Sequence, residues 1–126
     1  MRRCLPVAGW VVAILFSQDA LAHHAYAEFD VNRELTLRGI AKTVQWTSPH
    51  VWIDLMIRDL SGKESHWLVE AASPLVLHQF GWSRNSIKPG DHIRMVIHPR
   101  KDGAPSGSLV SAIVNGQVVG GMIRPA

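Results

Sequence analysis

The sequence predicts an all-β domain that contains one short helix. Turn signals recur at fairly even intervals, and the segments between them are rich in Val, Ile, Leu, Thr and Trp, which is typical of short strands. A helical pattern interrupts this series once, between the third and the fourth strand. The turn signals are Ser48-Pro49, Ser61-Gly62-Lys63, Lys88-Pro89-Gly90-Asp91, Lys101-Asp102-Gly103 and Asn115-Gly116.

The first three strands are expected at residues 34–46, 50–59 and 64–71. The first of them is long, and its apolar phase shifts after Gly39, which predicts a bulge or a sharp bend. Apolar residues alternate cleanly along the second strand, so one of its faces is expected in the core. A short loop that contains Gly62 joins the second and third strands as a hairpin.

The helix is expected from Ser73 to Gly81, because Ser73 is a good N-cap, Pro74 suits the first helical position and Gly81 suits the end. Strands follow at residues 92–98 and 109–114, and residues 118–126 form either an edge strand or a tail. This order predicts a small OB-fold-like five-stranded barrel, with an antiparallel β-sandwich as the alternative. The predicted interior residues are Val51, Ile53, Leu55, Ile57, Val69, Ile93, Met95 and Ile97.

Residues 1–22 have the order of a secretory signal peptide. Arg2 and Arg3 give a positive start, an apolar run follows over residues 5–16, and Ala20-x-Ala22 is a small-residue cleavage site. The run is shorter than the roughly 20 residues that span a bilayer as a helix, so we expect cleavage after Ala22 rather than a retained anchor. One domain, residues 23–126, is then exported to the periplasm or secreted.

Composition argues against several classes of function. The single cysteine, Cys4, falls in the removed segment, so the exported domain has neither a disulfide nor a thiolate metal ligand. Loss of Arg2, Arg3 and Asp19 lowers the net charge from +3 to +2, and no basic run is present, so no nucleic-acid partner is expected. We find no cysteine nucleophile, no Gly-x-Ser-x-Gly and no glycine-rich phosphate loop, and we therefore expect no enzyme activity. We also expect no membrane span after the signal peptide is removed.

Histidine is the residue type that suggests a function for this chain, because it is the commonest metal ligand in proteins. If the exported chain begins at His23, its free amine and its own imidazole can chelate one metal ion, and His24 can add a further nitrogen. Copper(II) favours such nitrogen-rich tetragonal sites. The alternative is that both side chains are exposed and idle. The seven histidines are His23, His24, His50, His66, His78, His92 and His98, and we expect the last three at the surface.

A second pair of ligands is expected on the outer face of the predicted hairpin. Side chains alternate with period two, so His50 and Glu70 become diagonal neighbours on the second and third strands. Together with the N-terminal histidines they give three or four nitrogen and oxygen ligands for copper(II) or another divalent metal. The alternative is a half-exposed polar sheet face that contains one His–Glu hydrogen bond.

Several short motifs lie along almost the whole of the predicted exported domain. They are His23-His24 with Glu28-Phe29-Asp30, Leu37-x-Gly39, Trp46-x-x-Pro49-His50, Trp67-x-x-Glu70 with Ser73-Pro74, Gly81-Trp82, and Lys88-Pro89-Gly90-Asp91. Together they resemble the motifs of a bacterial family of small exported proteins, domain-of-unknown-function family 6152 (DUF6152). The family often has Asn before the Pro-His pair, where this chain has Ser48. The resemblance implies an exported β-barrel domain, and it implies no activity.

Three functions remain open from the sequence. The leading hypothesis is an exported binding domain for copper or a similar divalent metal, held through histidine and glutamate. The second is a structural or protein-interaction module of the cell envelope whose histidines are incidental. The third is a domain that binds a small ligand, such as a sugar, on the barrel face.

Overall fold

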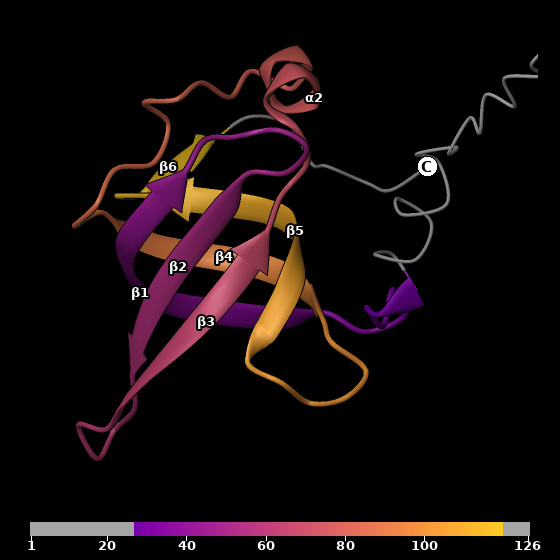
Figure 1. Ribbon diagram of the computed structural model, residues 1–126. Coiled ribbons are helices and arrows are strands. Elements are labelled where there is room, and N and C mark those ends of the chain that lie inside the picture. The colour runs from indigo at the N-terminus through magenta and orange to yellow at the C-terminus, as the bar shows by residue number, and fades with distance from the viewer. Residues whose placement is uncertain (1–26, 120–126) are drawn as a thin grey trace, which may run out of the picture.

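The computed structural model describes residues 27–119, and Figure 1 shows curved strands wrapped into a barrel with a helix at one end. The predicted signal peptide, residues 1–22, lies outside the described residues and stays a prediction. Within the described part of the chain, no helix is long and apolar enough to cross a bilayer. The elements are β1 (Leu35–Gln45), β2 (Trp52–Arg58), β3 (Glu64–Glu70), α2 (Pro74–Gln79), β4 (His92–Pro99), β5 (Ser106–Val114) and β6 (Gln117–Val119).

Strand pairing closes the sheet into a five-stranded barrel. The strands lie in the order β3-β2-β1-β4-β5-β6, and β3 additionally pairs with β5. This closing ladder is parallel, between residues 68–70 and 106–108, whereas the other ladders are antiparallel. The ring from β1 to β5, with α2 between β3 and β4, is the arrangement of an OB-fold. The predicted barrel is confirmed, and the sandwich alternative is wrong.

β1 serves both halves of the barrel because its pairing changes near its middle. Residues 35–40 pair with β4, and residues 40–45 pair with β2. The register shifts between Ala41 and Thr43, which is a bulge just past the predicted position. A Cβ atom on Gly39 would clash with the backbone carbonyl oxygen of Met56, so glycine allows β2 to approach β1 this closely.

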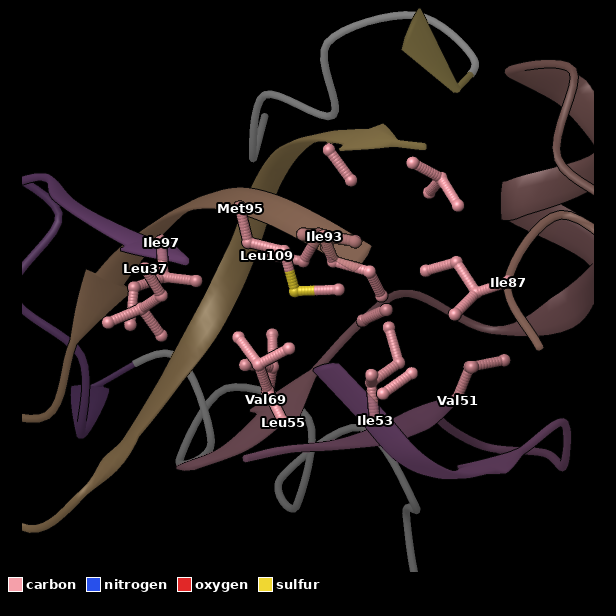
Figure 2. Packing of buried hydrophobic residues seen from close by; sticks show 14 of the residues in the cluster. Leu37, Val51, Ile53, Leu55, Val69, Ile87, Ile93, Met95, Ile97 and Leu109 are labelled. Atoms are coloured by element: carbon pink, nitrogen blue, oxygen red, sulfur yellow. The ribbon is translucent and has the colours of Figure 1, made fainter. Parts of the chain in front are cut away.

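Apolar side chains from all five barrel strands fill the interior, as Figure 2 shows. Seven of the eight predicted interior residues are buried, and the exception is Ile57, which is half-buried near the hairpin end of β2. Full burial of such a side chain stabilises the fold by roughly 1.5–3 kcal/mol. Because the chain has one cysteine, this core and the ladders around it stabilise the domain without an internal disulfide.

Helix α2 closes one end of the barrel. The Ser73 hydroxyl accepts a hydrogen bond from the N–H of Val76 at 3.3 Å, and proline occupies the first turn, as predicted. Leu77 is the buried residue of the helix and belongs to the same core cluster as Trp82 and Ile87. Gly81 follows with a φ of +83°, the left-handed conformation that terminates many helices.

Two expectations about the C-terminal half are wrong. β5 begins at Ser106 rather than at residue 109. A Cβ atom at position 107 would clash with Ile97, so glycine is what allows the strand to extend to this position. There the strand pairs with both β3 and β4. His98 is buried, not a surface residue, and its Nδ1 lies 2.9 Å from the carbonyl oxygen of Arg33. That hydrogen bond satisfies the ring inside the barrel wall.

Candidate metal centre

The outer face of the β2–β3 hairpin has the predicted register. Trp52 lies opposite Glu70, as the alternation of side chains requires. The ladder continues past the strand ends, because the carbonyl oxygen of Val51 accepts a hydrogen bond from the N–H of Ala71 at 2.8 Å. This extension fixes the backbone directly after His50, and the imidazole of His50 lies next to the carboxylate of Glu70.

Both acceptors near His50 face the same ring nitrogen. Nδ1 lies 3.1 Å from the carbonyl oxygen of Ala71 and 3.2 Å from Oε1 of Glu70. A carbonyl oxygen can only accept, so Nδ1 carries the proton and donates. In the neutral ring this leaves the lone pair on Nε2, which has no hydrogen-bond partner among the described residues. His50 therefore presents Nε2 as a free nitrogen donor.

Glu70 is the more buried member of the pair. Its side chain is 12% exposed, and that of His50 is 26% exposed. Burial raises the pKa of the Glu70 carboxyl above its usual value, and the nearby charge of Glu28 adds to the rise, whereas His50 and Arg100 oppose it. Electrostatic attraction to His50 is the largest of the effects that oppose this rise in the pKa of Glu70.

An ionic cluster centred on Arg100 adjoins this site, and sequence reasoning missed it. The guanidinium of Arg100 lies 2.5 Å from Glu28 and 2.7 Å from Asp102. Hydrogen bonding to Arg100 lowers the pKa of Asp102 to about 2, and the same bonds raise the pKa of Arg100. Glu28 is 72 residues away from Arg100 in the sequence, so no local spacing could reveal the contact. The N–H of Lys101 donates to the Glu28 carbonyl at 2.9 Å, which fixes this N-terminal segment to the barrel.

A second histidine–carboxylate pair lies on the same hairpin. Nδ1 of His66 is 3.0 Å from Oδ1 of Asp54, and the two side chains are 56% and 31% exposed. Both residues belong to the predicted outer face, so the alternation that placed His50 and Glu70 could also have found this pair. Its greater exposure makes it the weaker electrostatic contact.

The structure brings together two of the four predicted metal ligands. His50 and Glu70 are in contact, whereas His23 and His24 lie outside the described residues. Within residues 27–119 no group of three or more His, Cys, Asp or Glu side chains is arranged to hold a metal ion. A centre with three or more such side chains would need donors from outside residues 27–119.

Comparisons with known proteins add a family and a fold. The family described as "Family of unknown function (DUF6152)" matches residues 11–109, which confirms the resemblance seen in the motifs. Among solved structures, the chain is similar to the mitochondrial single-stranded DNA-binding protein of S. cerevisiae, with 9% identity and a TM-score of 0.48. That alignment covers 71% of this chain and 97% of the yeast protein. No curated protein sequence matches significantly.

Proposed function

The chain belongs to DUF6152, a family of unknown function. We propose that it is an exported binding domain that holds one divalent metal ion and that it prefers copper(II) to other divalent metals. The proposed ligands are Nε2 of His50 and nitrogen atoms of His23 and His24 at the processed N-terminus. Glu70 takes part mainly by orienting His50, and its second oxygen is available to the ion. The domain acts by binding and not by catalysis.

The observation that carries this proposal is the fixed tautomer of His50. Metal-bound histidines almost always donate their other ring N–H to a carboxylate or a backbone carbonyl, which orients the ring and raises its basicity. Nδ1 of His50 donates to the backbone carbonyl of Ala71 at 3.1 Å, and Oε1 of Glu70 lies 3.2 Å from the same nitrogen. This arrangement leaves Nε2 of His50 available as a metal ligand.

The position of Glu28 supports a contribution from the N-terminus. Its charge acts on Glu70, and its backbone is bonded to the barrel, so the chain passes close to the site at this residue. Four residue steps separate His24 from Glu28, and an extended chain covers at most about 14 Å over that distance. The proposal requires the imidazole of His24 to meet Nε2 of His50 within that span.

Copper(II) is the preferred ion because of the donor types. An α-amine and two or three imidazoles make a nitrogen-rich set, which suits the tetragonal geometry of copper(II). No thiolate is available, since the single cysteine lies at residue 4. Removal of the signal peptide after Ala22 would create the required free amine, so the proposal ties metal binding to export.

Calorimetry on the processed protein, isolated from the cell envelope, tests the site. We expect about one copper(II) per chain, with binding that weakens as pH falls through about 6.5, because protonated imidazole cannot ligate. His50→Ala, Glu70→Ala and a tag placed before His23 should each weaken binding by roughly 10- to 100-fold. The matched control is His66→Ala, which removes the same side chain from the same face and should leave the affinity unchanged.

Two results would refute the proposal. One is the absence of saturable binding of copper(II), zinc(II) or nickel(II) by correctly processed protein. The other is an equal loss of affinity in the His50→Ala and His66→Ala variants, which would indicate non-specific histidine binding. Intact-mass analysis provides the check on export, since a chain that retains Met1 or starts beyond Ala25 has no chelating amine at this position.

Exposed apolar side chains on α2 favour a second candidate function, a protein-interaction module of the cell envelope. Leu75 is 73% exposed on the helix, and Phe80, at its C-terminal cap, is 37% exposed. Large apolar side chains in this position are suited to a partner surface. If no metal binds, Leu75→Glu should abolish cross-linking to an envelope protein that the wild-type chain captures, whereas Leu60→Glu at the hairpin tip should not.

A further inference from the structure

A groove on the outer surface of the barrel has no role in the proposed metal centre. Its volume is about 620 Å³, and its lining comes from β1, β2, β4 and β5 together with Gly116. Small-molecule sites in proteins commonly have volumes of about 300–1,000 Å³. The lining combines cationic and apolar side chains, chiefly Arg38, Arg58, Arg94, Ile40, Met56 and Ile113.

The cations of the groove are concentrated by strand pairing. Arg38 lies directly opposite Arg94 on the β1–β4 ladder, and both side chains are exposed. Like charges in directly opposite positions destabilise a sheet. Within residues 27–119 neither arginine forms an ion pair, whereas Arg58 pairs with Glu64. The Arg38–Arg94 pair is therefore an electrostatic cost that an anion bound between the two guanidinium groups would remove.

In the part of the chain that the structure describes, the carboxylates next to the groove have partners other than Arg38 and Arg94. Glu64 is bonded to Arg58, and its pKa is lowered by that contact. Asp91 precedes β4, and its two oxygens accept hydrogen bonds from Asn115 and from the N–H of Lys88. The remaining titratable group of the lining is His92, which is exposed and adds no negative charge.

A row of apolar side chains runs beside the arginine row. Ile40 pairs with Met56 on β2 and is two residues along the same face from Arg38. Ile113 on β5 lies opposite Arg94, so it stands next to the two arginines on the side away from Arg38. All three apolar side chains are half-buried, so each leaves part of its surface in the groove. A ligand that spans both rows must be charged in one part and apolar in another.

We propose that this groove binds a small amphiphilic anion, a phosphate monoester or a carboxylate joined to an apolar body. Arg38 and Arg94 hold the anionic head with charge-assisted, bidentate hydrogen bonds, for which the planar guanidinium is suited. Ile40, Met56 and Ile113 contact the apolar body. A lipid headgroup and a soluble phosphate ester share this chemistry, and binding experiments separate the two sources.

Titration of the processed protein with octyl phosphate below its micellar range is the first measurement. We expect saturable binding of about one molecule per chain, at least tenfold tighter than inorganic phosphate and than neutral octyl glucoside. Arg38→Ala and Arg94→Ala should each weaken it about tenfold or more, and Ile40→Ser should weaken octyl phosphate without changing inorganic phosphate. Lys101→Ala, which removes one exposed charge outside the groove, is the matched control and should have no effect. Circular dichroism establishes that each variant is folded.

Vesicles identify the source of the ligand. Flotation with vesicles that contain phosphatidic acid, whose headgroup is a phosphate monoester, would identify a lipid headgroup if Arg38→Ala abolishes it and octyl phosphate competes with it. Octyl phosphate binding without flotation would identify a soluble ligand, and both outcomes support the groove. The proposal is overturned if octyl glucoside or inorganic phosphate binds as tightly as octyl phosphate. It is also overturned if Arg38→Ala and Arg94→Ala bind octyl phosphate normally.

Discussion

Leu55 and Leu60 offer the same substitution at opposite extremes of burial. Leu55 has no exposed surface and lies between Ala41 on β1 and Trp67 on β3, whereas Leu60 is fully exposed at the tip of the β2–β3 hairpin. Truncating a buried leucine to alanine removes transfer free energy and leaves a cavity, at a cost of about 2–5 kcal/mol. Both neighbouring strands of β2 are bonded into the closed ring, so the site cannot collapse, and we expect about 3–5 kcal/mol for Leu55→Ala.

Urea denaturation followed by circular dichroism measures this difference. A loss of about 3–5 kcal/mol is a large part of the 5–15 kcal/mol typical of a domain, and in a domain of this size it lowers the melting temperature by more than about 10 °C. Leu60→Ala should change the free energy of unfolding by less than about 0.5 kcal/mol. The placement of Leu55 in the barrel core is refuted if Leu55→Ala costs under about 1 kcal/mol, or if the two variants lose equal stability.

Two further predictions concern the bend in β1 and the buried carboxyl. Gly39→Ala should lower the free energy of unfolding by about 1–3 kcal/mol, because its Cβ atom meets the fixed carbonyl of Met56, whereas Gly103→Asn, at an open left-handed turn, should be nearly neutral in the same urea assay. Burial raises the pKa of Glu70 in the folded state, so the stability that its protonated form contributes is present below about 4.5 and is lost as pH rises through the folded pKa. In metal-free protein, Glu70→Gln should therefore gain stability relative to wild type between about pH 4 and pH 7.5, and an unchanged difference across that range would contradict the raised pKa.

Period-two alternation explains why much of the barrel could be predicted. The alternation of apolar residues predicts which face of β2 and of β4 is turned inward. Combined with the predicted hairpin between β2 and β3, it also predicts that His50 lies beside Glu70. Alternation works here because each barrel strand has one face inside and one outside. The start of β5 was missed because Ser106-Gly107-Ser108 has the composition of a turn, and only the close approach of Ile97 makes glycine necessary in a strand.

The two charge clusters depend on contacts between distant residues. Arg38, Arg58 and Arg94 are spread over three strands, so the sequence contains no basic run, and the β1–β2 and β1–β4 ladders alone bring them to one groove. The same limit applies to Glu28 and Arg100. The sequence predicts His98 at the surface because it lies at the end of a strand, and no local spacing reveals its partner, the carbonyl oxygen of Arg33, 65 residues away.

The parallel ladder between β3 and β5 has a consequence for the cooperativity of folding. Its residues, 68–70 and 106–108, are separated by 38 positions, and the ring is complete only when this ladder and the four antiparallel ladders among β1 to β5 have all formed. Opening any one strand of the ring exposes the backbone groups of two neighbours, which ties the five strands into a single unit for hydrogen exchange. β6 is outside the ring and pairs only with β5 in the described residues. The backbone amides of β6 can therefore exchange their hydrogens by local fraying, whereas the amides of the five barrel strands exchange through global unfolding of the domain.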